Sequence, residues 1–458
     1  MYNGVTVASD KPKEECGVFG VYGKEGEGLA RTTYYGLYAL QHRGQQSAGI
    51  AVAKEGNIMH HKQMGLVFEV FDDALLEELE GSIACGHVRY STMRDSNVIN
   101  AQPLVVKYRN GSLALAHNGS LVNAEDLRRQ LEQEGVIFQT SVDSEVIANL
   151  VARKDKGDIL EAVKDTMNCI RGAYALIIMT SDRLIGVRDP NGIRPLSLGI
   201  KDGRYMLSSE SCAFDTVEAK LIRDVEPGEM VVIDKEGLHS FFCKGPKTNK
   251  LCVFEFIYFG RPDSVMGGRN IYMSRRRAGA NLFKEHPAEA DIVISVPDSG
   301  TAAAIGYSEA SGIPFVEGLV KNRYVGRTFI EPKQRQREIG VALKLNVLED
   351  MVKGKRVIMV DDSIVRGTTS RNLVRMLKGA GAVEVHFRVS SPPVQHSCNF
   401  GIDTPNRENL VGANLSDDEI RDRIEADSLG YLSLEGLIEA VGEGREYCHA
   451  CFSGSYPI

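Results

Sequence analysis

The chain has 458 residues, of which 43% are hydrophobic and 25% are charged, and it contains no Trp. These proportions are typical of globular proteins and exclude the disordered and fibrous classes. The 54 Lys and Arg residues against 61 Asp and Glu residues give a formal charge of -7. This balance argues against a broad basic surface for nucleic acid or anionic membranes.

Neither a membrane span nor a secretory signal is visible in the sequence. No apolar run approaches the roughly 18 residues that a membrane-spanning helix needs, and residues 1–15 lack the apolar core of a signal peptide. We therefore expect a cytoplasmic protein that binds no nucleic acid and no membrane. Nine cysteines in so long a chain are too few for a secreted disulfide framework. Free thiols, a catalytic thiol or a metal site remain as interpretations.

The length predicts two domains, and the first has a sequence pattern typical of a layered fold. Residues 16–245 alternate short apolar runs with Gly, Asn and Asp turns, and helices are expected at 121–134 and 144–152. This pattern predicts an α+β domain. A polar and basic stretch at 235–250, which contains Gly and Pro, is the expected linker.

The second part of the chain alternates apolar strands with helical segments. Strands are expected at 291–297, 313–320, 355–362 and 382–389, and two acidic helices between about 416 and 445. Such alternation predicts an α/β domain with a parallel sheet that is covered on both faces. Ligands of these sheets bind at the carboxyl ends of the strands.

The most specific motif lies at the end of the strand expected at 355–362. Four apolar residues precede Asp361 and Asp362, and a turn rich in Gly and Thr then opens a helix. Backbone N–H groups at a helix N-terminus make a phosphate cradle, and paired carboxylates accept sugar hydroxyls or hold Mg²⁺. The alternative is that these residues only end a strand and cap a helix.

This segment resembles the phosphoribosyltransferase family, in which such a motif binds 5-phosphoribosyl-1-pyrophosphate (PRPP). The resemblance implies that Asp361 and Asp362 contact the ribose hydroxyls. It implies that the turn holds the 5-phosphate through Arg366, Gly367, Thr368, Thr369 and Ser370.

Two further segments agree with a PRPP site. The turn at 296–304 offers Ser299, which would complete a pyrophosphate and Mg²⁺ site with the two aspartates. A basic run at 321–337 begins with Lys321 and Arg323. It is either a solvated charged loop or a mobile lid that neutralises the pyrophosphate leaving group.

The N-terminal part carries a different signature, which begins at Cys16. Taken alone, Cys16 is more often a buried structural thiol. The segments QHRGQQSAGI, GHVRYST, AHNGSLVN and TSVDSE follow it in that order. Together with Cys16 they resemble the N-terminal-nucleophile glutaminase domain of amidotransferases.

The glutaminase resemblance implies a nucleophile, an oxyanion hole and a glutamine pocket. Cleavage before Cys16 would give it an α-amine with a pKa of about 7.7 to 8.0, which can act as general base for its own thiol. The implied oxyanion donors are the Asn118 side chain and the Gly119 N–H. Arg89 would bind the glutamine α-carboxylate and Asp143 the α-ammonium, and Arg43 would support the site. Taken singly, Arg89 fits a surface ion pair and Asp143 a helix cap.

The two signatures in one chain resemble the glutamine PRPP amidotransferase family. The resemblance implies an αββα N-terminal-nucleophile glutaminase domain at 16–245, followed by a type I phosphoribosyltransferase domain at 251–458. It implies the reaction of glutamine, PRPP and water to 5-phosphoribosylamine, glutamate and pyrophosphate, the first committed step of purine biosynthesis, with ammonia passed internally. Feedback inhibition by purine nucleotides and a homotetramer are implied as well. Residues Met93, Arg94 and Asp95 depart from the Ala-Gly usual in the family, which puts glutamine affinity or loop closure in doubt.

Cys448 and Cys451 are spaced as in metal sites and redox dithiols. In a subgroup of the family four cysteines hold a 4Fe-4S cluster, and this resemblance adds Cys252 and Cys398 to the pair. A structural Zn²⁺ on the same four thiolates is the alternative. Residues 1–15 would then be a propeptide, or else a disordered tail.

Two other functions compete with this interpretation. Another amidotransferase, such as an asparagine or glucosamine phosphate synthase, would not need the PRPP motif at 361–370. A non-catalytic regulator that senses PRPP or purines would not need a thiol nucleophile, so Cys16 and its partners argue against it.

Overall fold

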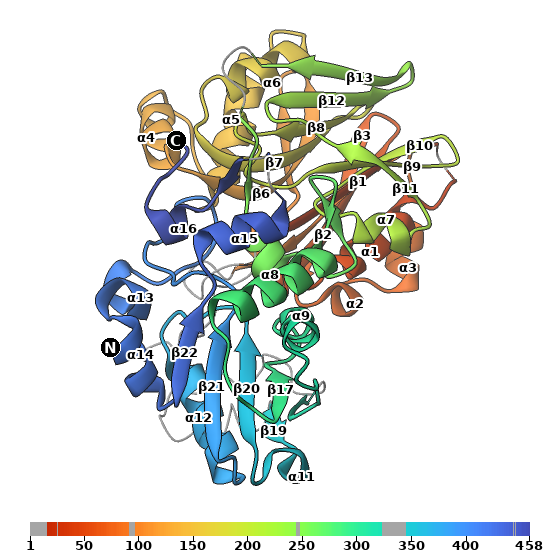
Figure 1. The fold of residues 1–458 in the computed structure, drawn as a ribbon. Coiled ribbons are helices and arrows are strands. Elements are labelled where there is room, and N and C mark those ends of the chain that lie inside the picture. The colour runs from red at the N-terminus through yellow and green to blue at the C-terminus, as the bar shows by residue number, and fades with distance from the viewer. Residues whose placement is uncertain are drawn as a thin grey trace, which may run out of the picture.

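The computed structural model describes residues 16–24, 26–90, 97–243, 248–322, 345–442, 444 and 446–458. Residues 16–243 form an N-terminal half built on two stacked sheets, and residues 248–458 form a C-terminal half built on a parallel sheet. Figure 1 shows the two halves one above the other, with helix α8 (Ile271–Glu285) near their junction.

A seven-stranded antiparallel sheet carries the N-terminal end of the described chain. Its order is β11 (Lys220–Asp224), β9 (Ser197–Lys201), β10 (Arg204–Ser208), β1 (Gly17–Tyr22), β4 (Ile83–Arg89), β2 (Ser47–Lys54) and β3 (Asn57–Met64). Strand β1 lies in the middle, where Val18 pairs with His87 of β4 and Phe19 pairs with Ser208 of β10. The residue before β1, Cys16, is therefore held at one end of a central strand.

A six-stranded sheet stacks on the first. Its order is β13 (Gly237–Phe242), β12 (Glu229–Asp234), β8 (Leu184–Arg188), β7 (Gly172–Met179), β6 (Gly111–Leu121) and β5 (Leu104–Tyr108). Val18 and Cys85 of the first sheet share one buried cluster with Ala175 and Ile177 of the second. Strand β7 is buried along its whole length because both of its faces are covered.

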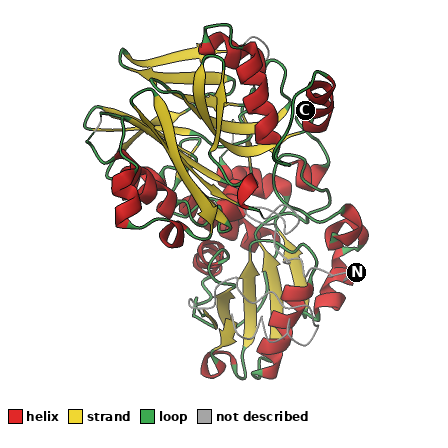
Figure 2. Cartoon of the chain, turned by 180° about the vertical axis from the view of Figure 1, so that it is seen from behind, coloured by secondary structure: helices red, strands yellow, loops and turns green. Residues whose placement is uncertain are grey.

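Helices cover the outer faces of both sheets and complete four layers. The N-terminal half contains α1 (Leu29–Ala39), α2 (Val67–Val70), α3 (Asp73–Glu78), α4 (Ala124–Gln133), α5 (Asp143–Lys154), α6 (Ile159–Met167), α7 (Cys212–Thr216) and the 3₁₀ turn η2 (Val98–Asn100). Leu37 of α1 packs against the first sheet, and Val146 of α5 and Val163 of α6 pack against the second. The expected αββα fold is confirmed, and Figure 2 shows the layers from behind.

The C-terminal half is an α/β layer structure, as expected. Its sheet of β17 (Ile292–Ser295), β20 (Arg356–Asp361), β21 (Glu384–Val389) and β22 (Ser428–Tyr431) is entirely parallel. Helices α8 and α9 (Thr301–Ser311) pack on one face, and α12 (Thr368–Gly379) and α14 (Asp417–Ile424) on the other.

Shorter elements join the two halves and close the ends of the sheet. They are β14 (Lys250–Cys252), the π-helix η3 (Glu255–Phe259), β15 (Val265–Met266), β16 (Arg269–Asn270), β18 (Leu319–Lys321), β19 (Leu345–Val347), α11 (Glu349–Val352), η4 (Arg407–Asn409), α13 (Val411–Asn414), α15 (Leu434–Val441), β23 (Glu446–Cys448) and α16 (Ala450–Ser453). Strand β14 pairs in parallel with β23, so the end of the chain returns to the junction.

Several sequence-based boundaries were wrong. The helix expected at 121–134 begins at Ala124 because Leu121 still pairs with Gly172 in the sheet. The linker expected at 235–250 contains strand β13, which pairs with β12. The polar composition of this segment gave no sign of a strand. Within 313–320, Phe315 forms an isolated parallel bridge with Val293 of β17, and only the last two residues enter a strand, β18, which pairs with β19. The two acidic helices expected between about 416 and 445 are confirmed as α14 and α15, but strand β22 lies between them and was not expected.

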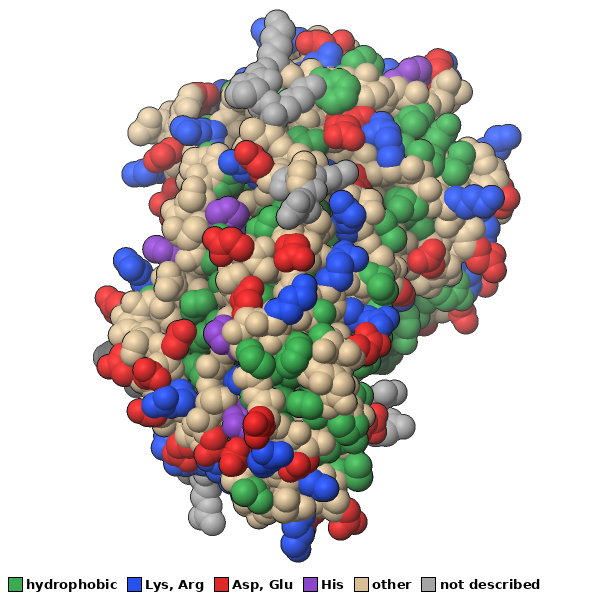
Figure 3. Space-filling view, viewed as in Figure 1, with side chains coloured by type: hydrophobic (Ala, Val, Ile, Leu, Met, Phe, Trp, Pro, Cys, Tyr) green, Lys and Arg blue, Asp and Glu red, His purple; other side chains and the backbone are tan. Residues whose placement is uncertain are grey.

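Acidic and basic side chains are interspersed over the face of the molecule drawn in Figure 3, as the nearly balanced composition predicts. In the ranges that the structure describes, we find no helix with the length and apolar character that a membrane crossing requires.

Candidate active sites

The Cys16 thiol lies half-buried at the start of β1. Its Sγ donates to the Tyr90 carbonyl oxygen at 3.8 Å. Burial raises the pKa of this thiol, and the nearby Arg89 guanidinium opposes the rise. The thiol therefore depends on its charged neighbours to reach the thiolate, which is the nucleophilic form.

Both predicted glutamine-binding side chains lie close enough to act electrostatically on Cys16. Arg89 ends β4, is 8% exposed and donates to the Asn100 carbonyl oxygen, so it is not a surface ion pair. Asp143 begins α5 and accepts from Leu121 N at 2.9 Å. Burial alone would raise the pKa of Asp143, but His117 and the backbone N–H groups outweigh burial and lower the pKa. Asp143 is thus an anion facing the same site.

The predicted oxyanion donors lie in β6, which comes between Arg89 and Asp143 along the chain. Asn118 is 0% exposed, and its Oδ1 has no hydrogen-bond partner among the described residues. Gly119 has a φ of 136°, and a Cβ there would lie 2.0 Å from the Ala173 carbonyl oxygen. Only glycine fits this position, because the backbone of β7 approaches Gly119 closely.

Sequence reasoning missed Ser209, which joins the nucleophile strand to the oxyanion strand. Its buried hydroxyl accepts from Val18 N at 3.0 Å and from Asn118 Nδ2 at 3.5 Å. Ser209 N also donates to the Val18 carbonyl oxygen at 3.0 Å. The local sequence around Ser209 does not indicate a contact with Val18 or Asn118. Ser209 reaches them because β10, which precedes it, pairs with β1.

Arg43 supports Cys16 directly. Its Nε donates to the Cys16 carbonyl oxygen at 3.2 Å, and its other nitrogens bond to two buried carboxylates, Glu210 and Glu255. Neither glutamate was predicted from the sequence, since they lie far from Arg43 along the chain.

The predicted PRPP residues gather at the carboxyl end of β20. Asp361 and Asp362 are 1% and 0% exposed. Ser299 Oγ donates to Asp362 Oδ2, and Ser363 Oγ donates to Asp362 Oδ1 at 2.5 Å. Lys321 lies at the same end of the sheet and pairs with Asp298 at 2.7 Å. Arg323 lies outside the described residues, as does the rest of the basic run to residue 337.

The predicted phosphate turn opens α12 as expected. Gly367 has a φ of 78° at the position before the helix, and Ser370 is buried in its first turn. A cavity of about 250 Å³ adjoins the turn, with Arg366 and Thr368 among its lining residues. The buried Arg366 Nε has no hydrogen-bond partner within the described ranges, so a donor is available beside the cradle.

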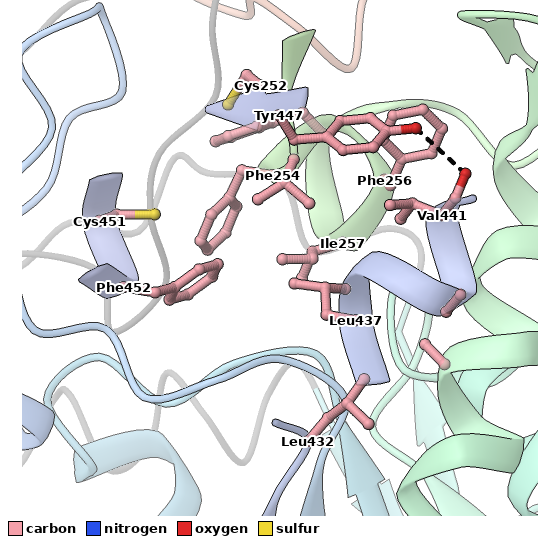
Figure 4. Close-up of a cluster of buried hydrophobic side chains, with 14 of the residues drawn as sticks. Cys252, Phe254, Phe256, Ile257, Leu432, Leu437, Val441, Tyr447, Cys451 and Phe452 are labelled. Atoms are coloured by element: carbon pink, nitrogen blue, oxygen red, sulfur yellow. Dashed lines mark hydrogen bonds between the residues drawn. The ribbon is translucent and has the colours of Figure 1, made fainter. Parts of the chain in front are cut away.

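The four cysteines singled out in the sequence come together at the junction of the halves. Cys252 pairs with Cys448 across β14 and β23. In Figure 4 the Cys451 side chain points toward the ring of Phe254, and Cys252 lies above that ring. Burial raises the pKa of Cys252, Cys448 and Cys451, and the negative charge of a Cys398 thiolate raises it further for all three.

The donor set and its surroundings fit a group bound by thiolates. Phe400 N donates to Cys398 Sγ at 3.3 Å, the kind of contact that sulfur ligands of clusters receive. Among the described residues, however, no three His, Cys, Asp or Glu side chains are arranged to hold a single metal ion.

Comparison with known proteins identifies the family. Residues 87–216 match the model of a glutamine amidotransferase domain. The chain is 54% identical over 457 residues to an amidophosphoribosyltransferase of Synechocystis, which covers 98% of this chain and 92% of the relative. The chain belongs to the amidophosphoribosyltransferase family. The Bacillus subtilis member is 50% identical over 452 residues, covering 97% of this chain and 94% of the relative.

Solved structures of the family agree with the fold. The Bacillus subtilis glutamine PRPP amidotransferase, complexed with ADP and GMP, superposes with a TM-score of 0.92 at 49% identity, covering 96% of this chain and 97% of that one. Amidophosphoribosyltransferases are pentosyltransferases that catalyse the first step of purine biosynthesis, and this chain is such an enzyme. The comparisons give no support to a non-catalytic regulator.

Proposed function

We propose that the chain forms 5-phosphoribosylamine from PRPP with ammonia released from glutamine, using the two sites described above. The carrying observation is that Cys16, Arg89, Asp143 and Asn118 lie together in one half, while Ser299, Asp361, Asp362 and the turn at 366–370 lie together in the other. Residues 16–245 form the glutaminase domain in this proposal, and residues 251–458 the phosphoribosyltransferase domain.

The glutaminase step uses residues that surround Cys16. Arg89 binds the glutamine α-carboxylate and Asp143 the α-ammonium, which presents the side-chain amide to the thiolate. The amide C–N bond breaks as the thioester forms, and ammonia leaves with a proton taken from the thiol. Asn118 Nδ2 and Gly119 N donate to the oxyanion, each worth about 3 kcal/mol in the transition state. Water then hydrolyses the thioester to glutamate.

The phosphoribosyl step uses the C-terminal half. The turn from Arg366 to Ser370 binds the 5-phosphate, and Asp361 and Asp362 accept the ribose hydroxyls. Lys321 and Arg323 neutralise the pyrophosphate. Ammonia forms a bond to the anomeric carbon while the bond to pyrophosphate breaks. Bound Mg²⁺, held by Ser299, Asp361 and Asp362, would add positive charge beside the leaving group.

Cys252, Cys398, Cys448 and Cys451 hold a 4Fe-4S cluster in this proposal. Three buried thiols and the half-buried Cys398 thiol gather at the junction of the halves, which supports a shared thiolate-bound group. The cluster would supply a structural link, since neither half-reaction transfers electrons. Replacing Cys398 by Ser in anaerobically purified protein should remove iron, sulfide and brown colour; full iron content in that variant would contradict the ligand set.

Processing, regulation and assembly are further parts of the proposal. Removal of residues 1–15 would expose the Cys16 α-amine as the general base for the thiol, and an active enzyme whose intact mass includes Met1 would contradict it. Purine nucleotides would inhibit, because the Bacillus subtilis structure is a complex with ADP and GMP. We also propose a cytoplasmic homotetramer.

The decisive experiment measures phosphoribosylamine formation with either glutamine or ammonium as nitrogen donor. Cys16→Ala should lose at least 10³-fold of the glutamine-dependent rate, since it removes the nucleophile, and should keep the ammonia-dependent rate. Cys169→Ala is the matched control, because Cys169 is a free thiol of similar burial. Glutamine-dependent activity that survives in Cys16→Ala would refute the proposed nucleophile.

A further inference from the structure

A buried arginine lies between one carboxylate from each half of the chain. Arg43 Nη1 donates to Glu210 Oε1 at 2.5 Å and to Glu255 Oε2 at 2.9 Å, and Nη2 donates to Glu255 Oε1 at 2.8 Å. Arg43 is 1% exposed, and both carboxylates are 0% exposed. Glu210 follows β10 in the N-terminal half, whereas Glu255 begins η3 in the C-terminal half. The ion pairs therefore cross the junction.

The same guanidinium reaches the nucleophile. Arg43 Nε donates to the Cys16 carbonyl oxygen at 3.2 Å. The same side chain therefore contacts the Cys16 backbone through Nε and the two carboxylates through Nη1 and Nη2. Burial disfavours its charge, but Glu255 and Glu210 outweigh burial and raise the pKa of Arg43. Two parallel bonds to Glu255 also fix the plane of the guanidinium, as bidentate pairs do.

The segment that carries Glu255 is itself held firmly. Arg275 donates to the Phe256 and Gly260 carbonyl oxygens, both at 2.8 Å, which satisfies backbone groups of the π-helix. Glu210 Oε2 accepts from Arg261 N at 2.9 Å and from Ser264 Oγ at 2.7 Å. The position of η3 relative to the N-terminal half is thus fixed on both sides of Arg43.

We propose that Glu255 is a positioning residue for the glutaminase nucleophile, which it holds in place through Arg43. The inference rests on the proposed role of Cys16. Since a displacement of about 1 Å in a reacting group can cost 10²-fold in rate, the orientation of Arg43 matters for thiol attack. The contact also links the C-terminal half to the Cys16 backbone through two side chains, Glu255 and Arg43.

The test replaces Glu255 by Gln, which keeps the size of the side chain but loses the charge and one acceptor. Glutamine-dependent kcat should fall at least tenfold. The KM for PRPP and the ammonia-dependent rate should stay at wild-type values, because among the described residues Glu255 does not bond Ser299, Asp361, Asp362 or the turn at 366–370. Glu255→Asp retains the charge and should recover part of the glutamine-dependent kcat.

Glu229→Gln provides a matched control. Glu229 is also 0% exposed and forms a bidentate pair with Arg223, with both distances 2.7 Å, in the same half as Cys16. It does not bond Arg43 or Cys16 among the described contacts, so this variant should keep the wild-type glutamine-dependent kcat.

Three outcomes would overturn the inference: unchanged glutamine-dependent kcat in Glu255→Gln, equal loss with ammonium, or equal loss in Glu229→Gln. If Glu255→Gln does not fold, as thermal unfolding would show, Glu255→Asp carries the same comparison between the two nitrogen donors. A wild-type enzyme that forms no phosphoribosylamine from either donor would instead refute the proposed function.

Discussion

The two candidate sites of this chain are built by opposite means. The glutaminase site lies between stacked antiparallel sheets, where strand pairing fixes Cys16, Asn118 and Ser209 relative to one another. The PRPP site lies where a parallel strand ends, and one short segment supplies Asp361, Asp362 and the phosphate turn. The first site therefore depends on packing between distant segments, and the second on local geometry.

Among the variants that separate the two sites, we expect Gly119→Ala to cause the largest loss of glutamine-dependent rate. The added Cβ would meet the Ala173 carbonyl oxygen at 2.0 Å at a φ of 136°, so β6 must shift and the oxyanion donor with it. Loss of one such donor costs about 10² to 10³-fold in kcat. The glutamine-dependent rate should fall by this factor and the ammonia-dependent rate should remain.

The matched control is Gly135→Ala. Gly135 also has a positive φ, of 86°, but a Cβ there would meet nothing within 4 Å. It should leave both rates unchanged. An equal fall of both rates in Gly119→Ala would mean that the close contact serves the fold and not the oxyanion.

Asp362→Asn tests the other site and should reduce both rates together. The carboxylate accepts from Ser299 and Ser363, and an amide can no longer offer two anionic oxygens to ribose or Mg²⁺. We expect a loss of about 10²-fold, measured as phosphoribosylamine formation at saturating PRPP. Asp350→Asn, on the exposed end of α11, is the control. A loss confined to glutamine would contradict the assignment.

Ser209→Ala should have a smaller, selective effect. It removes the acceptor of Val18 N and of Asn118 Nδ2, and one hydrogen bond of about 1.4 kcal/mol corresponds to a tenfold change. Glutamine-dependent kcat should fall about tenfold. Ser240→Ala, which loses one bond to Glu229, should not change it. A rise of KM for glutamine without a change of kcat would contradict the link to Asn118.

The smallest effect concerns the pH dependence of thiol alkylation. Burial raises the pKa of Cys16, and Arg89 opposes this rise. Arg89→Gln should therefore move the iodoacetamide reaction of Cys16 in the ligand-free protein to higher pH, because less thiolate is present at a given pH. Arg129→Gln, on the exposed surface of α4, should leave the profile unchanged. A shift to lower pH would refute the electrostatic role of Arg89.

Much of the fold followed from local patterns. The apolar strand ending in Asp361 predicted β20 and the helix after Gly367, because burial and turn chemistry act over neighbouring residues. The errors arose where tertiary pairing overrides composition. Polar residues of β13 belong to a sheet edge, and β22 is short and lies between two acidic helices, so neither has a strong local signal.

The sequence alone predicted Cys16 as the nucleophile, the PRPP motif at 361–370 and the family resemblance, because each depends on short motifs whose residue types and order along the chain are specific. The contacts of Ser209 with β1 and Asn118, and of Glu255 with Arg43, became visible only in the tertiary structure. These contacts join segments far apart in the chain. They exist because sheet pairing and burial bring such segments together, and a buried charge needs a partner wherever along the chain that partner lies.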